Sequence, residues 1–214
     1  MGKIHKSETF IFLLVAFSFL IGLAAYGQLP DTVASHWNTS GEVNGSMSRF
    51  WGTFFEPFVA LALFLLFLFV PRMDPMRKNI EKFRPYYDNV ILFVFFFLFY
   101  LYTLTLYENF GYNFDLLRFI APAFGAMFFY FGVALPHTEP NWTLGIRTPW
   151  TISNEVVWKK THKIGGTLFK ISGVLALFGV LFPQWAIWLI LAPLILSSLY
   201  LLSYSYFAFT KLRV

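Results

Sequence analysis

Residues 89–107 read NVILFVFFFLFYLYTLTLY, nineteen consecutive positions without a charged side chain. A helix of about 20 mostly apolar residues is long enough to cross the hydrocarbon core of a bilayer. Of the 214 residues in the whole chain, 57% are hydrophobic and 13% are charged, whereas soluble domains carry roughly 25% charged residues. A soluble core cannot bury so much apolar surface. The stretch therefore predicts a membrane-spanning helix in an integral membrane protein.

Five further segments have the same apolar character and length, at residues 9–29, 52–70, 116–135, 164–182 and 185–209. Only Pro183 and Gln184 separate the last two, which predicts a tight helical hairpin. Lys3 and Lys6 precede the first segment, as in a signal peptide, but its apolar run is too long and no small-residue cleavage site follows cleanly. We therefore predict a retained first helix and an all-α polytopic bundle of six transmembrane helices.

Lysine and arginine are distributed unequally between the loops that join these spans. If the N-terminus is cytoplasmic, the inner segments hold thirteen of the sixteen basic residues. The outer segments hold Arg49, with Arg118 near the outer end of a span. Such an excess marks the cytoplasmic side of short loops, so both chain ends are predicted to be cytoplasmic. Membrane insertion then accounts for the net charge of +5, and we expect no direct nucleic-acid partner.

The chain is predicted to divide into two regions. Residues 1–75 form an N-terminal helical hairpin with an extracytoplasmic loop at residues 30–51. Residues 76–214 form a four-helix transmembrane region with a cytoplasmic loop at residues 137–163. The sequence has no cysteine, which excludes disulfides, thiolate metal sites and cysteine catalysis.

The outer loop reads LPDTVASHWNTSGEVNG from residue 29 to residue 45. Pro30 is expected to stop the first helix, because proline cannot continue the helical hydrogen bonds. Residues 38–41 and 44–45 are typical of turns, in which Asn and Gly supply positive φ at low cost.

Three interpretations of this loop stay open. It is an ordered surface loop, or a recognition surface, or a metal site in which His36 acts with Asp31 or Glu42. One histidine with scattered carboxylates is not a metal-ligand spacing, so no metal is predicted. As a recognition surface, the loop would contact a toxin or another ligand through four residues: His36, Trp37, Asn38 and Gly41.

The inner loop reads EPNWTLGIRTPWTISNEVVWKKTHKIGG from residue 139 to residue 166. Gly145 permits a tight approach or an unusual backbone angle, and Thr148-Pro149 favours an extended entry. Thr151 or Ser153 can cap a helix that begins there and continues into the fifth span. Helical spacing places five residues near one face of this helix: Glu155, Trp158, Thr161, His162 and Gly165.

The inner loop has two interpretations, one structural and one as a docking surface, because its residues do not favour catalysis. Glu155 and His162 lie two turns apart, about 10 Å along the axis, and no nucleophile or metal set accompanies them. We therefore expect neither an enzyme nor a cofactor. Either Arg147, Glu155 and His162 tie the loop to the helix ends, or the loop docks a partner, since Arg and Trp are frequent interface anchors. The residues for these roles are Asn141, Gly145, Arg147, Thr148, Pro149, Trp150, Glu155, Trp158 and His162.

Charged residues within the predicted spans are few. Glu56, Glu108 and Asp115 lie near outer ends, and Lys170 is close enough to the inner end to snorkel. None is predicted at mid-membrane, where a proton- or ion-coupled transporter usually has such a group. A small membrane transporter or an uncharacterised membrane enzyme is kept as the alternative function.

The two loops carry a resemblance to a known family. The run NWTLGIRTPWT at residues 141–151 is followed by Glu155, Trp158, Thr161, His162 and Gly165-Gly166, and the whole closely resembles the signature of the SdpI family of membrane immunity proteins. The outer Leu29-Pro30, His36-Trp37-Asn38, Gly41 and Gly45 resemble the small domain of unknown function that often precedes this signature. Together the resemblance covers nearly the whole chain.

This resemblance implies a multi-pass protein of the bacterial plasma membrane that gives resistance to a secreted toxic peptide. Its partners would then be membrane lipid and an extracellular toxic peptide. In the best-known member of the family, the toxin-bound protein is also thought to hold a small cytoplasmic transcriptional repressor at the membrane. The resemblance thus adds a role in signal transduction and a cytoplasmic partner.

Overall fold

Six long helices dominate the computed structural model, which describes residues 5–112 and 114–212. Each is long and apolar enough to span a membrane. They are α1 (Lys6–Tyr26), α2 (Arg49–Met73), α4 (Arg84–Asn109), α5 (Leu116–Ala134), α7 (Glu155–Leu177) and α8 (Ala186–Thr210). The prediction of an all-α polytopic bundle with six spans is confirmed.

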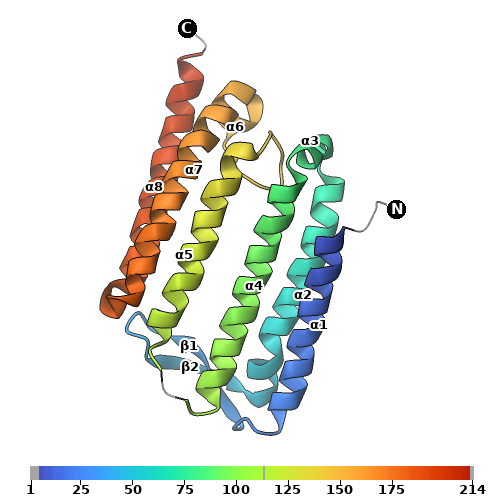
Figure 1. Ribbon diagram of the computed structural model, residues 1–214, viewed down its shortest axis with the longest axis vertical. Helices are drawn as coiled ribbons and strands as arrows, with labels where there is room; N and C mark the ends of the chain where they lie inside the picture. The colour runs from blue at the N-terminus through green and yellow to red at the C-terminus, as the bar shows by residue number, and fades with distance from the viewer. Residues whose placement is uncertain (1–4, 113, 213–214) are drawn as a thin grey trace.

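Short elements close the two ends of the bundle (Figure 1). Strands β1 (Thr32–Trp37) and β2 (Val43–Ser48) form an antiparallel hairpin at one end, which we call the hairpin end. At the other end lie α3 (Arg77–Lys82) and α6 (Pro149–Ser153). This end carries most of the basic residues, and we call it the basic end. Three 3-10 turns complete the fold: η1 (Leu135–His137), η2 (Phe178–Val180) and η3 (Pro183–Trp185).

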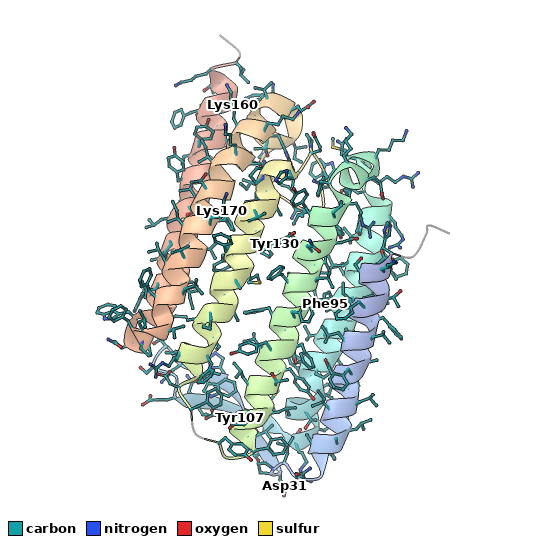
Figure 2. All side chains as sticks on the ribbon, in the orientation of Figure 1. Asp31, Phe95, Tyr107, Tyr130, Lys160 and Lys170 are labelled. Atoms are coloured by element: carbon teal, nitrogen blue, oxygen red, sulfur yellow. The ribbon has the colours of Figure 1, made fainter. Side chains whose placement is uncertain are left out.

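The helices pack as two groups of three. Helices α1, α2 and α4 contact one another, and α5, α7 and α8 contact one another. Aromatic pairs join the groups between α4 and α5: the rings of Phe93 and Tyr130 stack at 4.5 Å, and those of Phe97 and Phe124 meet edge to face at 4.7 Å. The middle of the bundle is apolar, as Phe95 and Tyr130 illustrate in Figure 2, whereas Asp31 and Lys160 mark opposite ends.

The closest helix contact is between α5 and α7. A Cβ built on Gly132 would lie 2.6 Å from the carbonyl oxygen of Gly166, and one built on Gly173 would lie 2.7 Å from that of Gly125. Small residues let helix backbones approach closely in membranes, where packing rather than hydrophobicity drives association. These four glycines therefore fix α5 against α7.

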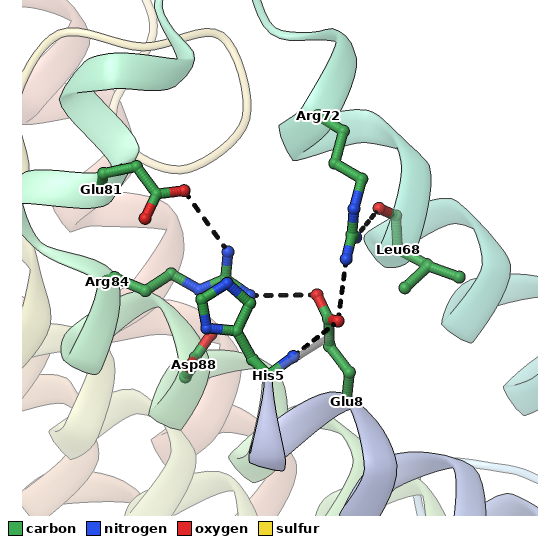
Figure 3. A network of polar contacts seen from close by, with 7 residues as sticks. All are labelled: His5, Glu8, Leu68, Arg72, Glu81, Arg84 and Asp88. Atoms are coloured by element: carbon green, nitrogen blue, oxygen red, sulfur yellow. Dashed lines mark hydrogen bonds and ion pairs between the residues drawn. The ribbon is translucent and has the colours of Figure 1, made fainter. Parts of the chain in front are cut away.

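A cluster of ion pairs joins the basic ends of α1, α2 and α4 (Figure 3). The Glu8 carboxylate lies between two guanidiniums, 2.8 Å from Arg72 and 3.1 Å from Arg84. Arg84 also contacts Asp88 at 2.6 Å and Glu81 at 3.8 Å. Glu8 is buried, so these bonds offset the cost of removing its charge from water.

The ends of two helices differ from the sequence prediction. Helix α1 ends at Tyr26 with Gly27 as its C-cap, so Pro30 lies beyond the helix and does not terminate it. At the start of α7, Asn154 is the N-cap and accepts bonds from the N–H groups of Val156 and Val157. The prediction that Thr151 or Ser153 caps this helix was wrong.

Candidate functional site

The tip of the β-hairpin is a turn built around Asn38. Its side-chain oxygen accepts from the N–H groups of Ser40 at 2.9 Å and Glu42 at 3.0 Å, and its amide donates to the Glu42 carboxylate at 2.8 Å. Gly41 has φ of +81°, a conformation that glycine adopts at low cost. The turn predicted at residues 38–41 is confirmed.

The second turn predicted in this loop, at Asn44-Gly45, was wrong. Both residues lie within β2, and Gly45 does not have positive φ. Asn44 instead faces β1, where its side-chain oxygen lies 2.5 Å from Nδ1 of His36. Asn-Gly is typical of hairpin turns, but here the pair lies in β2 at an irregularity of the strand register opposite His36.

The hairpin is held on the bundle by three contacts. Val33 is buried in a cluster with Leu29 and Tyr102. The Asn109 side chain, on α4, accepts from the N–H of Ala34 at 2.7 Å and donates to its carbonyl oxygen at 3.0 Å, as a neighbouring strand would. An ion pair of 2.6 Å between Arg49 and Asp31 closes the base of the hairpin. Asn109 was not predicted as a hairpin contact, because in the sequence it is simply an amide at the end of an apolar span.

The four predicted contact residues of the hairpin do not form one cluster. His36 is exposed and pairs with Asn44, whereas Asn38 is used within the turn. Trp37 is half-buried, and its buried indole Nε1 has no hydrogen-bond partner among residues 5–112 and 114–212. Gly41 lines a hollow of about 530 Å³, the tip hollow, between the hairpin tip and the adjoining ends of α5 and η3. Other residues that line it are Thr39, Ser40, Phe114, Asp115, Leu117 and Gln184.

At the basic end, Asn141 organises the turn that begins the signature loop, residues 139–154. Its buried side chain donates to the carbonyl oxygens of Glu139 and Leu144, and accepts from the N–H groups of Thr143 and Leu144 at 2.8 and 2.7 Å. Both donors and both acceptor positions of the amide are thereby occupied within the loop. Asn141 therefore shapes the loop from inside.

Trp158 and His162 hold the same loop from α7. The two rings stack at 3.9 Å, and the indole N–H of Trp158 donates to the carbonyl oxygen of Thr138 at 2.9 Å. His162 Nε2 accepts from the N–H of Ile146 at 2.8 Å, and Nδ1 lies 2.8 Å from the carbonyl oxygen of Trp158. These partners require a neutral ring with its proton on Nδ1. Both nitrogens are occupied, so the ring is arranged for structure rather than proton transfer.

Gly145 has the backbone conformation that this arrangement requires. Its φ is +138°, and a Cβ built on it would lie 2.6 Å from His162 Nε2 and 2.9 Å from the Trp158 ring. The close approach predicted for this glycine is confirmed. Without a side chain at this position, the loop can pass directly over the two stacked rings.

The second half of the loop is bonded to α8. Thr148 is extended, caps α6, and its hydroxyl lies 3.1 Å from that of Ser205. The ring of Trp150 meets the ring of Tyr206 at 5.2 Å, edge to face. Pro149 occupies the first turn of α6, where a missing N–H costs nothing.

Two of the predicted residues point outward. Glu155 is exposed and pairs with Lys159 at 2.6 Å, whereas Trp158 and His162 are buried. Glu155 is the first residue of α7, so the face predicted from helical spacing is buried only in its later part. Arg147 is exposed, and its guanidinium donates to the carbonyl oxygen of Trp142.

Asp74 is a residue of this site that the sequence analysis missed. Its buried carboxylate accepts from the N–H of Trp142 at 2.8 Å, the hydroxyl of Thr143 at 2.7 Å and the N–H of Met76 at 2.7 Å. The end of α2 is thereby bonded to the signature loop. In the sequence, Asp74 is distinguished only as a single acidic residue between Pro71 and Pro75, in a linker that is otherwise mostly basic.

Comparisons with known proteins match two segments of the chain, one that contains the signature loop and one that contains the hairpin. Residues 137–205 match the model of the SdpI/YfhL protein family. The matched segment comprises the signature loop, α6, α7 and most of α8. Residues 13–61 match a domain of unknown function, DUF1648, which here comprises most of α1, the hairpin and the first half of α2.

The chain is also similar to a curated protein over nearly its whole length. It is 25% identical over 205 residues, which are 94% of this chain and 96% of the relative, to Immunity protein SdpI of Bacillus subtilis (strain 168). No solved structure matches. The resemblance to the SdpI family is confirmed, and with six spanning helices the chain is a multi-pass protein of the plasma membrane. The boundary at residues 75 and 76 stays a prediction.

Proposed function

We propose that this protein is a bacterial membrane immunity protein that gives resistance to a secreted toxic peptide. One observation carries the proposal: the similarity to an immunity protein extends over 94% of the chain and 96% of that relative. A similarity of this extent includes the hairpin and the signature loop together. It also includes all six helices that connect them.

The proposed orientation places the hairpin end outside the cell and the basic end in the cytoplasm. The excess of Lys and Arg at the basic end supports it, because such residues are retained on the cytoplasmic side. At the hairpin end the described basic residues are Arg49, already paired with Asp31, and Arg118. A secreted peptide would then meet the hairpin first.

The tip hollow supports peptide binding at this end. It combines apolar Phe114 and Leu117 with the polar groups of Ser40, Asp115 and Gln184. A peptide presents both kinds of group within a few residues, and binding pockets typically pair an apolar lining with a few polar groups that fix orientation. We propose that the peptide enters the tip hollow beside Gly41 and extends along the hairpin, where His36, Trp37 and Asn38 are the other contact residues.

Survival of a sensitive bacterium tests this function. Cells that express the full chain are exposed to a panel of toxic peptides secreted by bacteria, and surviving colonies are counted. We expect protection against at least one peptide. Trp37→Ala is expected to weaken that protection, since losing an aromatic contact of about 2 kcal/mol lowers peptide affinity by about 30-fold.

The matched control is Trp142→Ala, which removes an exposed tryptophan at the opposite end of the bundle. Its expected protection equals that of the unchanged protein. If the full chain protects against none of the peptides, the immunity role is wrong. Equal loss in both tryptophan variants would remove the hairpin from the proposed contact site.

A signalling role is the finer part of this proposal. The signature loop is bonded internally through Asn141 and to α7 through His162, yet Trp142 and Arg147 remain exposed. A rigid loop that presents an arginine and a tryptophan is typical of a docking surface. In this role a cytoplasmic repressor would bind the basic end. Protection from the peptide in the survival assay would not require that binding.

The alternative of a transporter depends on Glu56. It lies about 10 Å along α2 from Arg49, and its buried Oε2 has no hydrogen-bond partner in the described part of the chain. Ionisable groups inside spans often belong to proton relays. Glu56→Gln in the same survival assay separates the two functions, because protection by peptide binding is retained and protection by proton-coupled export is lost.

A further inference from the structure

A cavity lies under the signature loop, where the two groups of three helices meet. Its volume is about 250 Å³. Its walls are Val90 of α4, Phe131 and Ala134 of α5, and Phe169 of α7, and residues 143–147 of the loop cover it. The cavity is therefore mainly apolar and is closed on one side by backbone that the family signature shapes.

The cavity lies at the depth where α5 ends. Ala134 is the last residue of α5, and Leu135 of η1 also lines the cavity. On the α4 side, the ring of Tyr86 stacks on that of His137 at 4.0 Å, at the same end of the bundle. Polar termini and aromatic side chains mark the border between hydrocarbon and water. The cavity therefore extends from that border into the apolar layer.

Arg147 is the one charged residue among those that line the cavity. Its guanidinium donates to the carbonyl oxygen of Trp142, and no carboxylate of the described residues lies within ion-pair distance of it. Arg49, Arg72 and Arg84, in contrast, each contact a carboxylate. The cavity thus combines apolar walls with an exposed cation that lacks a protein counter-charge.

We propose that this cavity binds an anionic phospholipid of the leaflet at the basic end, with an acyl chain between α4, α5 and α7 and the phosphate on Arg147. Pockets for whole drug-sized ligands have volumes of about 300–1,000 Å³, so a cavity of about 250 Å³ suits part of a longer chain. The planar guanidinium pairs with phosphate through two parallel hydrogen bonds. Basic pockets between transmembrane helices bind anionic lipid head groups.

The bound lipid would also support the signature loop. Gly145 and Ile146 line the cavity, and the N–H of Ile146 is the group that His162 holds. A chain beneath these residues fills the space between the loop and α4. The lipid therefore couples the two helix groups at the basic end, independently of whether the hairpin binds a toxin.

Thermal unfolding of the purified full-length protein in detergent tests the site. The probes are phosphatidylglycerol and phosphatidylcholine with identical acyl chains, titrated separately. We expect phosphatidylglycerol to raise the unfolding temperature at lower concentration than phosphatidylcholine. Arg147→Gln is expected to weaken the phosphatidylglycerol effect about tenfold in concentration, since a charged hydrogen-bonding contact contributes roughly that factor.

Two further variants make the test specific. Lys160→Gln removes an exposed cation that does not line the cavity, and it should leave the preference for phosphatidylglycerol unchanged. Ala134→Leu fills the cavity and should weaken the effect of both lipids. The proposal is overturned if the two lipids act equally on the unchanged protein. It is also overturned if Lys160→Gln weakens the effect as much as Arg147→Gln does.

Discussion

Replacing Gly145 by alanine is expected to lower the free energy of unfolding by about 3 kcal/mol or more. The backbone there has φ of +138°, a conformation that side chains rarely adopt. The new methyl group would also lie 2.6 Å from His162 Nε2, which must then move from the N–H of Ile146. Strain and a lost buried hydrogen bond therefore act together. Denaturant unfolding of the purified protein in detergent measures the change.

Gly27→Ala is the matched control for this substitution. Gly27 has φ of −71°, and a Cβ built on it meets no atom within 4 Å. Alanine there is expected to be neutral or to stabilise the protein by about 0.5 kcal/mol, because it restricts the unfolded chain. Equal stability of the two variants would mean that the signature loop does not pass over His162 as described.

The second large effect is expected from Glu8→Gln. This carboxylate is 8% exposed and pairs with Arg72 and Arg84, so the substitution leaves two guanidiniums without it. Breaking a buried ion pair by removing one partner costs about 3–5 kcal/mol. Arg72 is partly open to solvent and Arg84 retains Asp88, so we expect a loss below that range, about 2–3 kcal/mol.

Glu155→Gln makes the same chemical change at an exposed site. The Glu155 side chain is 61% exposed, and its one ion pair among the described residues is with Lys159, four residues along α7. Solvent screens exposed pairs of this kind, so Glu155→Gln is expected to leave the free energy of unfolding nearly unchanged. Unfolding of both variants under the same conditions gives the comparison. If Glu8→Gln is no more destabilising than Glu155→Gln, the cluster does not join α1 to α2 and α4.

The sequence predicted the spans well because a membrane helix is specified by the length of an apolar run, a local property. It did not predict the hairpin at residues 32–48. Its second strand, VNGSMS, has little apolar alternation, and strands are recognised mainly by that alternation. The hairpin instead depends on Val33, which is buried against helices, and on the distant amide of Asn109.

A similar limit applies to the signature loop. Gly145, Trp158 and His162 are close in sequence, and helical spacing was enough to place the last two on one face. Asp74 and Asn109 were missed, because their partners lie 68 and 75 residues away in the chain. Local spacing contains no information about contacts at such separations. The residues that attach each loop to the bundle therefore appear only in the folded structure.

The proposed immunity role requires the hairpin to face the outside of the cell, and cysteine labelling tests that requirement directly. The chain has no cysteine, so Ser40→Cys at the hairpin tip and Ser153→Cys in α6 each introduce one exposed thiol. Intact cells are treated with a membrane-impermeant maleimide, and lysed cells serve as the control. We predict that Ser40→Cys is labelled in intact cells and Ser153→Cys only after lysis. Labelling of Ser153→Cys alone in intact cells would contradict the proposal, because a cytoplasmic hairpin cannot meet a secreted peptide.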